Sequence, residues 1–97
     1  MQYIKVTWRH QNPKEPTLLY SELDSERYES RKIEVFANGQ RGFADSKENS
    51  GSTFLGTVPF PPLEEIATDE QFVPAEITAE EFEREWSVRR EQSHPTK

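Results

Sequence analysis

The dipeptide Asn38-Gly39, which stands between two runs of alternating apolar and polar residues, constrains the fold of this chain most strongly. A two-residue type I′ turn needs positive φ at both central positions, and Asn-Gly meets that need at low steric cost. The pattern therefore predicts a β-hairpin over residues 27–45. With Asn38 and Gly39 as the turn, Ala37 faces Gln40, and the pairing continues as Phe36/Arg41, Val35/Gly42, Glu34/Phe43, Ile33/Ala44 and Lys32/Asp45.

This register separates the hairpin into two faces, because successive side chains of a strand point to opposite sides of the sheet. One face is small and aliphatic and consists of Ile33, Val35, Ala37 and Ala44. The other face combines aromatic rings with charges. Together with two tyrosines from the preceding segments it forms the candidate binding site, which consists of Tyr20, Tyr28, Lys32, Glu34, Phe36, Arg41, Phe43 and Asp45.

The chain before the hairpin predicts two further strands. Residues 2–9 alternate, with Ile4, Val6 and Trp8 on one side, which indicates a strand with one buried face. Residues 17–23 carry apolar side chains on both sides, so this strand is either covered on both faces or interrupted by a bulge. With the hairpin these strands form a four-stranded antiparallel meander, to which residues 53–57 add a short fifth strand.

Two helices are predicted after the hairpin. Pro62 suits the first turn of a short helix over residues 63–67, where no backbone N–H is needed. A capping box begins the C-terminal helix, because Thr78 can accept from the backbone N–H of Glu81 while Glu81 reaches back. Phe82 stands at the fourth helical position and continues an apolar stripe that faces the sheet.

The length of 97 residues allows one domain with one modest core. Residues 1–91 are predicted to form a single α+β domain, and residues 92–97 a flexible tail. The architecture is an antiparallel meander sheet of four to five strands, with a short helix and a C-terminal helix packed on one face.

Composition narrows the function classes. The absence of cysteine removes disulfides, thiolate metal sites and cysteine nucleophiles together. No apolar run approaches ~20 residues and no signal sequence follows Met1, so we expect a cytoplasmic protein with no membrane contact. The net charge of −6 disfavours nucleic acid and favours a basic protein partner, although such a charge first of all promotes solubility.

The sequence contains little that points to catalysis. His10 lies beside a proline-rich loop and His94 lies in the predicted tail, and neither has an evident partner. The carboxylates do not follow the spacing of a calcium loop, and no glycine-rich phosphate loop is present, so no metal or cofactor is expected. An enzyme would need His10 together with Tyr20, Glu22 or another carboxylate.

The aromatic face of the hairpin has two interpretations. In the first, the C-terminal helix covers it, with Phe82 and Trp86 packed on Phe36 and Phe43, because a chain with few aliphatic residues would not leave large rings exposed without use. In the second, the rings stack the bases of a single-stranded nucleic acid, an interaction worth ~1–3 kcal/mol per base. The net charge opposes the second interpretation.

Several segments carry a family resemblance: Met1-Gln2-Tyr3-Ile4-Lys5-Val6-Thr7-Trp8, Leu19-Tyr20-Ser21-Glu22-Leu23-Asp24, Arg31-Lys32-Ile33-Glu34-Val35-Phe36, Pro61-Pro62-Leu63-Glu64-Glu65-Ile66 and Glu76-Ile77-Thr78-Ala79-Glu80-Glu81-Phe82. From Tyr3 to about Trp86 the chain resembles a family of small bacterial single-domain proteins of unknown function. The resemblance brings no activity and no site residue. Its one functional implication, a slight one, is an association with contact-dependent or polymorphic toxins.

These observations favour a non-enzymatic protein-binding module, most concretely an acidic immunity-type inhibitor of a basic bacterial toxin. The expected partner is another protein, and the chain itself is expected to be a monomer or a homodimer. A small enzyme that uses His10 and carboxylates, and a single-stranded nucleic-acid binder, are the alternatives.

Overall fold

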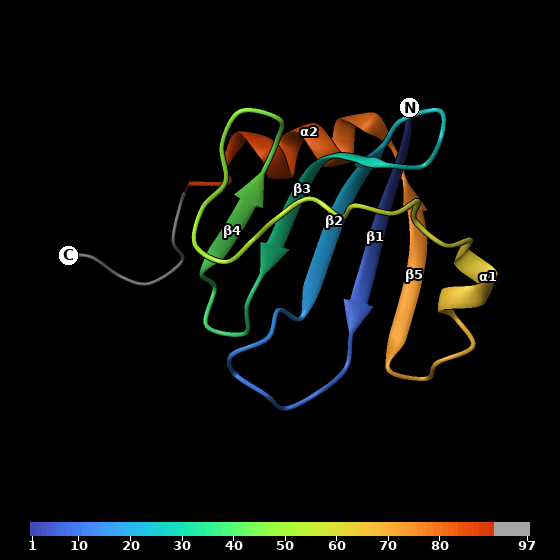
Figure 1. Cartoon of the computed structure of the whole chain (residues 1–97). Helices are drawn as coiled ribbons and strands as arrows, with labels where there is room; N and C mark the ends of the chain where they lie inside the picture. The colour runs from blue at the N-terminus through green and yellow to red at the C-terminus, as the bar shows by residue number, and fades with distance from the viewer. Residues whose placement is uncertain (91–97) are drawn as a thin grey trace.

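The computed structural model describes residues 1–90, so the predicted tail with His94 lies outside the described residues. A five-stranded antiparallel sheet has the order β4-β3-β2-β1-β5 and is accompanied by two helices (Figure 1). The elements are β1 (Gln2–Trp8), β2 (Leu18–Leu23), β3 (Glu29–Val35), β4 (Arg41–Ala44), α1 (Leu63–Ile66), β5 (Phe72–Ile77) and α2 (Ala79–Ser87). The predicted α+β class and the four-stranded meander are confirmed.

The fifth strand is β5 and not the predicted segment 53–57, which forms no strand. β5 pairs antiparallel with β1, with Tyr3 opposite Ile77 and Trp8 opposite Phe72. Pro74 lies in the middle of this strand and hides its strand pattern in the sequence. A proline is tolerated there because β5 is an edge strand, where a missing N–H need not cost a hydrogen bond of the sheet.

The hairpin forms, but the predicted register was wrong by one residue. Only Gly39 has positive φ in the turn, at 89°, so Asn38 does not complete a type I′ turn. Gly39 N donates to Phe36 O at 2.9 Å and Phe36 N donates to Gln40 O at 2.9 Å, which closes a three-residue loop. A shift of one residue reverses the face of every side chain on the second strand.

The observed pairs are Val35 with Arg41, Glu34 with Gly42, Ile33 with Phe43 and Lys32 with Ala44. Alternation then places Arg41 and Phe43 on the same face as Ile33 and Val35. Lys32 and Glu34 lie on the other face. The aliphatic face and the aromatic, charged face that the two-residue turn predicted are therefore not formed.

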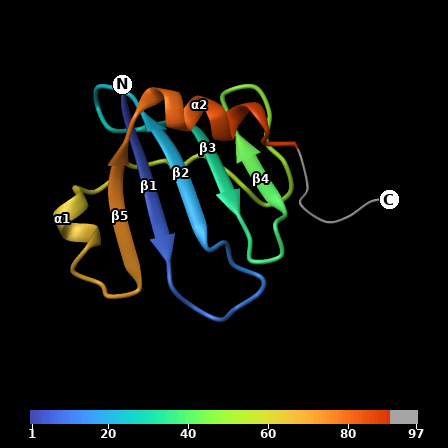
Figure 2. The ribbon, with the colours of Figure 1, turned by 180° about the vertical axis from the view of Figure 1, so that it is seen from behind.

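Helix α2 covers the face of the sheet that is seen in Figure 2. Its start is confirmed, because Thr78 Oγ1 accepts from Glu81 N at 3.1 Å. Phe82 is completely buried and contacts Tyr20 and Ile33 in one core cluster. This helix lies on the sheet because its single buried residue fills the space over the central strands.

A buried ion pair stabilises the same layer. The Glu22 carboxylate accepts from Arg31 Nε at 2.8 Å and from Arg31 Nη2 at 2.7 Å. The Arg31 guanidinium also bonds Glu83 of α2 and lies 4.9 Å and 5.0 Å from the ring centroids of Phe82 and Trp86. Arg31 thus connects β2, β3 and α2.

The segment that leads into α1 crosses the opposite face of the sheet (Figure 1). There Phe60, Leu63 and Ile66 pack on a second buried cluster, which consists of Ile4, Val6 and Leu23. Strand β2 is therefore covered on both faces, and its register also shifts between Glu22 and Leu23. Both explanations for its apolar residues are correct.

Neither edge of the sheet offers a free pairing strand within residues 1–90. On β4, Phe43 O accepts from Ser50 N at 2.9 Å and Phe43 N donates to Ser50 Oγ at 2.9 Å. On β5, Pro74 interrupts the row of donors. Covered edges and proline are common means of preventing sheet extension between chains. In the same residue range, neither helix is long and apolar enough to cross a bilayer.

Gly42 is required because Thr53 packs directly on it. A Cβ atom at position 42 would lie 2.1 Å from Thr53 Oγ1 and 3.2 Å from Thr53 Cβ. Thr53 is buried and its hydroxyl donates to Glu34 at 2.8 Å, so it has little room to move. We expect Gly42→Ala to lower the free energy of unfolding by about 1–3 kcal/mol, as overpacking does.

Urea unfolding followed by circular dichroism measures this loss, and Gly42→Ala/Thr53→Ala is the matched double variant. Thr53→Ala alone removes the clashing hydroxyl, so the second alanine should cost much less in that background. An equal cost of Gly42→Ala with and without Thr53 would contradict the steric explanation.

Candidate binding site

The eight residues of the predicted site do not share a face. Three lie on the side that α2 covers, namely Tyr20, Arg41 and Phe43. Lys32 and Glu34 lie on the opposite side. The remaining three are outside the strands, namely Tyr28, Phe36 and Asp45. The structure therefore brings together only parts of the predicted set.

The prediction that the C-terminal helix covers Phe36 and Phe43 is correct for Phe43 and wrong for Phe36. Trp86 packs edge-on against Phe43, with ring centroids 5.9 Å apart. Phe36 instead lines a polar hollow beside Arg41 and residues 50–53. Asp45 accepts from the backbone N–H groups of Lys47 and Glu48, which lowers the pKa of its carboxyl, so it has a local role in the turn.

His10 is held by its own loop. Its Nδ1 accepts from Asn12 N at 3.0 Å, and its Nε2 lies 2.7 Å from Pro16 O, where it donates. The ring also meets Trp8 edge-on at 4.5 Å. Both ring nitrogens are therefore engaged in closing the loop between β1 and β2. Within residues 1–90, no three acidic, histidine or cysteine side chains gather as metal ligands.

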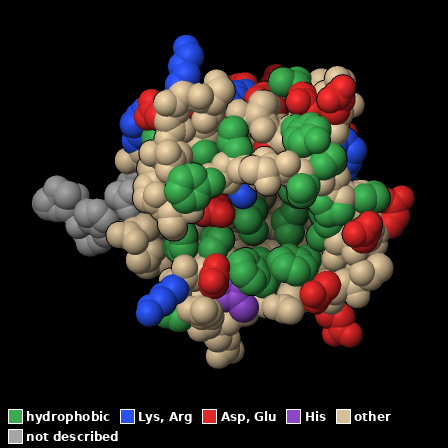
Figure 3. All heavy atoms as spheres, in the orientation of Figure 1, with side chains coloured by type: hydrophobic (Ala, Val, Ile, Leu, Met, Phe, Trp, Pro, Cys, Tyr) green, Lys and Arg blue, Asp and Glu red, His purple; other side chains and the backbone are tan. Residues whose placement is uncertain are grey.

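A largely apolar concave site lies between the sheet and α1. It is a pocket of about 350 Å³ on the side opposite α2. In the space-filling view, hydrophobic side chains gather around this hollow (Figure 3). Its lining consists of Val6, Leu19, Ser21, Glu29, Lys32, Phe60, Pro61, Glu65, Ile66, Asp69 and Phe72. Of the residues predicted from the sequence, only Lys32 belongs to it.

One wall of the pocket is positioned by Arg27. This residue has a φ of 69°, a left-handed conformation that costs a non-glycine residue about 1–2 kcal/mol. Its Nε donates to Phe60 O at 3.0 Å and its Nη2 to Pro61 O at 2.8 Å, while Phe60 N donates to Arg27 O at 2.7 Å. Three hydrogen bonds offset the strain and hold the wall. Arg27 and Phe60 are 33 positions apart in the sequence, so no local sequence pattern indicates the contact between them.

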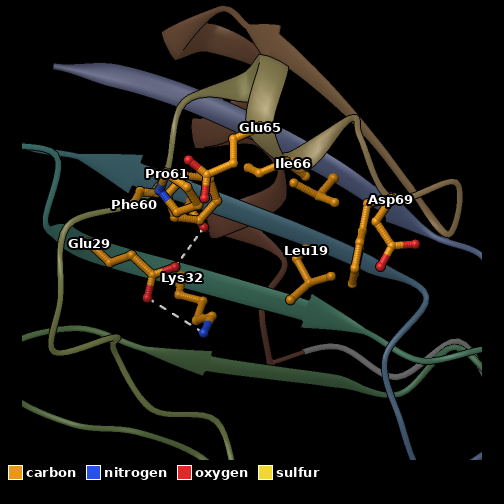
Figure 4. A pocket seen from close by; sticks show the side chains of 11 residues that line it. Leu19, Glu29, Lys32, Phe60, Pro61, Glu65, Ile66 and Asp69 are labelled. Carbon is orange, nitrogen blue, oxygen red and sulfur yellow. Dashed lines mark hydrogen bonds and ion pairs between the residues drawn. The ribbon is translucent and has the colours of Figure 1, made fainter.

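The polar end of the pocket is internally compensated. The Glu29 carboxylate is almost completely buried and accepts from Ser21 Oγ at 2.9 Å and from Gly56 N at 2.6 Å. Figure 4 shows it facing Lys32. Lys32 Nζ lies 3.5 Å from Glu29 Oε1 and donates to Phe54 O at 3.2 Å. Lys32 Nζ also lies 4.0 Å from Glu34 Oε2, so the ammonium group is engaged by two carboxylates and this end offers no free positive charge.

The mouth of the pocket is acidic. Glu65 and Asp69 stand four positions apart along α1 and the turn that follows it, and both are exposed. Asp69 Oδ1 accepts from Gln71 N at 3.0 Å, whereas the Glu65 carboxylate has no side-chain partner among residues 1–90. Figure 4 shows Asp69 at the end of the pocket away from the Glu29–Lys32 pair. The site is thus an apolar hollow with a polar end whose ammonium group is already paired and with exposed carboxylates at its mouth.

Sequence reasoning missed this site because its residues come from distant segments. Val6 and Leu19 appear in the sequence only as core positions, and Phe60 and Ile66 as parts of a connection and a short helix. One signal was available. Ser21 stands two positions after Leu19, so alternation places its hydroxyl on an otherwise apolar face of the strand.

Comparison with known proteins gives one match. A family model described as Domain of unknown function (DUF6881) matches residues 2–91. The comparisons with curated proteins and with solved structures gave no match.

Proposed function

The chain belongs to this uncharacterised family, and we propose that it is a non-enzymatic protein-binding module whose partner inserts an apolar side chain into the pocket. The pocket of about 350 Å³ is the observation that carries the proposal. Most of its walls are apolar, and the polar groups at its inner end, those of Ser21, Glu29 and Lys32, are already bonded to one another or to the backbone. Pockets of this size and character are the usual places where proteins bind ligands.

The surroundings of the pocket favour a protein as the ligand. Phe54 and Val58 lie on the segment that leads to the pocket wall, and they are 63% and 69% exposed. Large apolar side chains exposed beside a pocket are typical of protein interfaces. At such interfaces one anchor side chain that fills a pocket contributes much of the binding energy.

The most concrete form of this function is an immunity-type inhibitor of a basic bacterial toxin in the cytoplasm. The net charge of −6 supports it, because opposite net charges accelerate association. The enzyme alternative has lost support, since both nitrogens of His10 are engaged in its own loop. The nucleic-acid alternative relied on one aromatic face, and those aromatic residues are dispersed.

Affinity capture from extracts of the native host, with the pocket filled in one variant, tests the proposal. Ile66→Trp places a large ring at the half-buried rim of the pocket. Val73→Trp is the matched control, because Val73 is 40% exposed and lies on a different face of β5 from the pocket residue Phe72. The wild type and Val73→Trp should recover the same protein, and Ile66→Trp should not.

Circular dichroism and urea unfolding should show that both variants are folded. Recovery of the partner by Ile66→Trp as efficiently as by the wild type would place the interaction elsewhere. Repeated capture without any specific partner, or saturation of the pocket by a small molecule from the extract, would also overturn the proposal.

A further inference from the structure

We infer that the pocket selects an aromatic side chain flanked by Lys or Arg, with Glu65 and Asp69 receiving the cation. This inference rests on the proposed function and names the chemistry of the partner. It follows from three properties of the pocket: its volume, the internal pairing of the charged groups at its polar end and the carboxylates at its mouth.

The volume favours an aromatic group. A pocket of about 350 Å³ corresponds to roughly twelve water molecules at ~30 Å³ each, which exceeds the needs of a methyl or isopropyl group. The walls include two rings, from Phe60 and Phe72. An aromatic side chain gains contact area against such walls, and pairs of rings add a geometry-dependent attraction.

The inner end of the pocket does not attract a charge. Glu29 already accepts hydrogen bonds from Ser21 and Gly56 and faces Lys32. Among residues 1–90, Lys32 is the only cation that lines the pocket, and its ammonium group is held by Glu29, Glu34 and Phe54 O. A carboxylate or phosphate would have to displace one of these contacts. The inserted group is therefore uncharged.

The mouth, in contrast, attracts a cation. The exposed carboxylates of Glu65 and Asp69 line the pocket, and Figure 4 shows them at different points along it. Among residues 1–90, the one basic lining residue, Lys32, is already paired with Glu29 and Glu34. The whole chain carries a net charge of −6, which adds a field of the same sign. A Lys or Arg next to the inserted ring would meet these carboxylates, and an acidic neighbour would be repelled.

Titration of the ¹⁵N-labelled full chain with four end-capped tripeptides tests the inference by NMR. The peptides are Lys-Trp-Lys, Gln-Trp-Gln, Glu-Trp-Glu and Lys-Gly-Lys. Lys-Trp-Lys should shift the amide signals of Ser21, Lys32 and Ile66 and bind roughly 2- to 10-fold more tightly than Gln-Trp-Gln, the range that exposed ion pairs supply. Glu-Trp-Glu should bind most weakly of the three tryptophan peptides, and Lys-Gly-Lys should leave those signals unchanged.

The variant Glu65→Gln/Asp69→Asn should lose the preference for Lys-Trp-Lys over Gln-Trp-Gln. Glu80→Gln/Glu81→Gln is the matched control, because it removes the same net charge from the first turn of α2, on the other side of the sheet. The preference should persist in the control. It should also shrink as salt rises from about 0.05 M to about 0.5 M, because screening shortens the range of exposed charges.

Equal affinity for Lys-Trp-Lys and Gln-Trp-Gln, or equal effects of the two double variants, would overturn the inferred chemistry while leaving the capture result intact. Binding of none of the peptides would also overturn it. The proposed function fails separately, when the capture experiment yields no partner that Ile66→Trp loses.

Discussion

Phe82→Ala is expected to lower the free energy of unfolding by about 3–5 kcal/mol. Phe82 has no exposed surface, although it belongs to a surface helix. Its ring centroid lies 5.4 Å from that of Tyr3 and 6.3 Å from that of Trp86, and the Arg31 guanidinium lies over its face. The substitution leaves a cavity at the point where α2 meets the sheet. A loss of this size is a large part of the 5–15 kcal/mol that stabilises an ordinary domain.

Urea unfolding followed by far-ultraviolet circular dichroism measures the effect. Val73→Ala is the control, since Val73 is 40% exposed and its truncation should cost less than ~1 kcal/mol. Phe82→Leu keeps an apolar side chain and should lose less than Phe82→Ala. A loss below ~1.5 kcal/mol for Phe82→Ala would show that the helix is not held by this ring, because buried Phe truncations cost at least twice that.

Arg31→Met is expected to lower the free energy of unfolding at pH 7 by about 3–5 kcal/mol, because it leaves a buried carboxylate without its partner. Glu22 is only 6% exposed, and Arg31 supplies two of its hydrogen bonds. The methionine side chain can still pack against the rings of Phe82 and Trp86, over which the Arg31 guanidinium lies. The loss therefore reports the charge and hydrogen bonds more than the packing.

The destabilisation caused by Arg31→Met should depend on pH in a definite direction. Hydrogen bonds from Arg31 are the main reason why the pKa of Glu22 lies below its ordinary value. A folded-state pKa below the unfolded one adds stability above the unfolded pKa of about 4.3, and that stability disappears as pH falls through the folded pKa. In Arg31→Met, Glu22 keeps its hydrogen bonds from Ser30 and Tyr3 but loses the largest cause of its low pKa, so burial, which raises the pKa, is less opposed. The cost of Arg31→Met should therefore be smaller at pH 4 than at pH 7.

Two variants isolate the pair. Glu83→Gln removes the exposed partner of Arg31 and should cost less than ~1 kcal/mol, as surface ion pairs do. Glu22→Gln/Arg31→Met removes both buried charges and should recover part of the stability that Arg31→Met loses. A pH-independent cost of Arg31→Met between pH 4 and pH 7 would rule out Glu22 as its origin.

The elements that the sequence predicted correctly are those with local signals. Alternation of Ile4, Val6 and Trp8 identified β1, and the hydroxyl of Thr78 marked the first residue of α2. Both signals act within a few residues of the chain, so they do not depend on what packs above. The family resemblance over most of the chain agrees with the uncharacterised family that matches residues 2–91.

The errors arose where one local choice had a distant effect. Asn38 keeps a negative φ, so the loop contains three residues and the face of Phe43 is reversed. The candidate site on the hairpin required Phe43 on the same face as Lys32 and Glu34. The changed register places Phe43 on the opposite face, so the predicted site residues are separated. The fifth strand was missed because Pro74 masks it, although its position at the edge of the sheet tolerates proline.

The sequence by itself determined an α+β domain, its meander of four strands, the beginning of α2 and the net charge of −6. Only the tertiary structure decided the hairpin register, the identity of the edge strand and the pocket between the sheet and α1. Alternation repeats every two residues, so a single extra loop residue exchanges the two faces of a strand. The pocket joins residues from Val6 to Phe72, and contacts over such separations leave no local pattern in a single sequence.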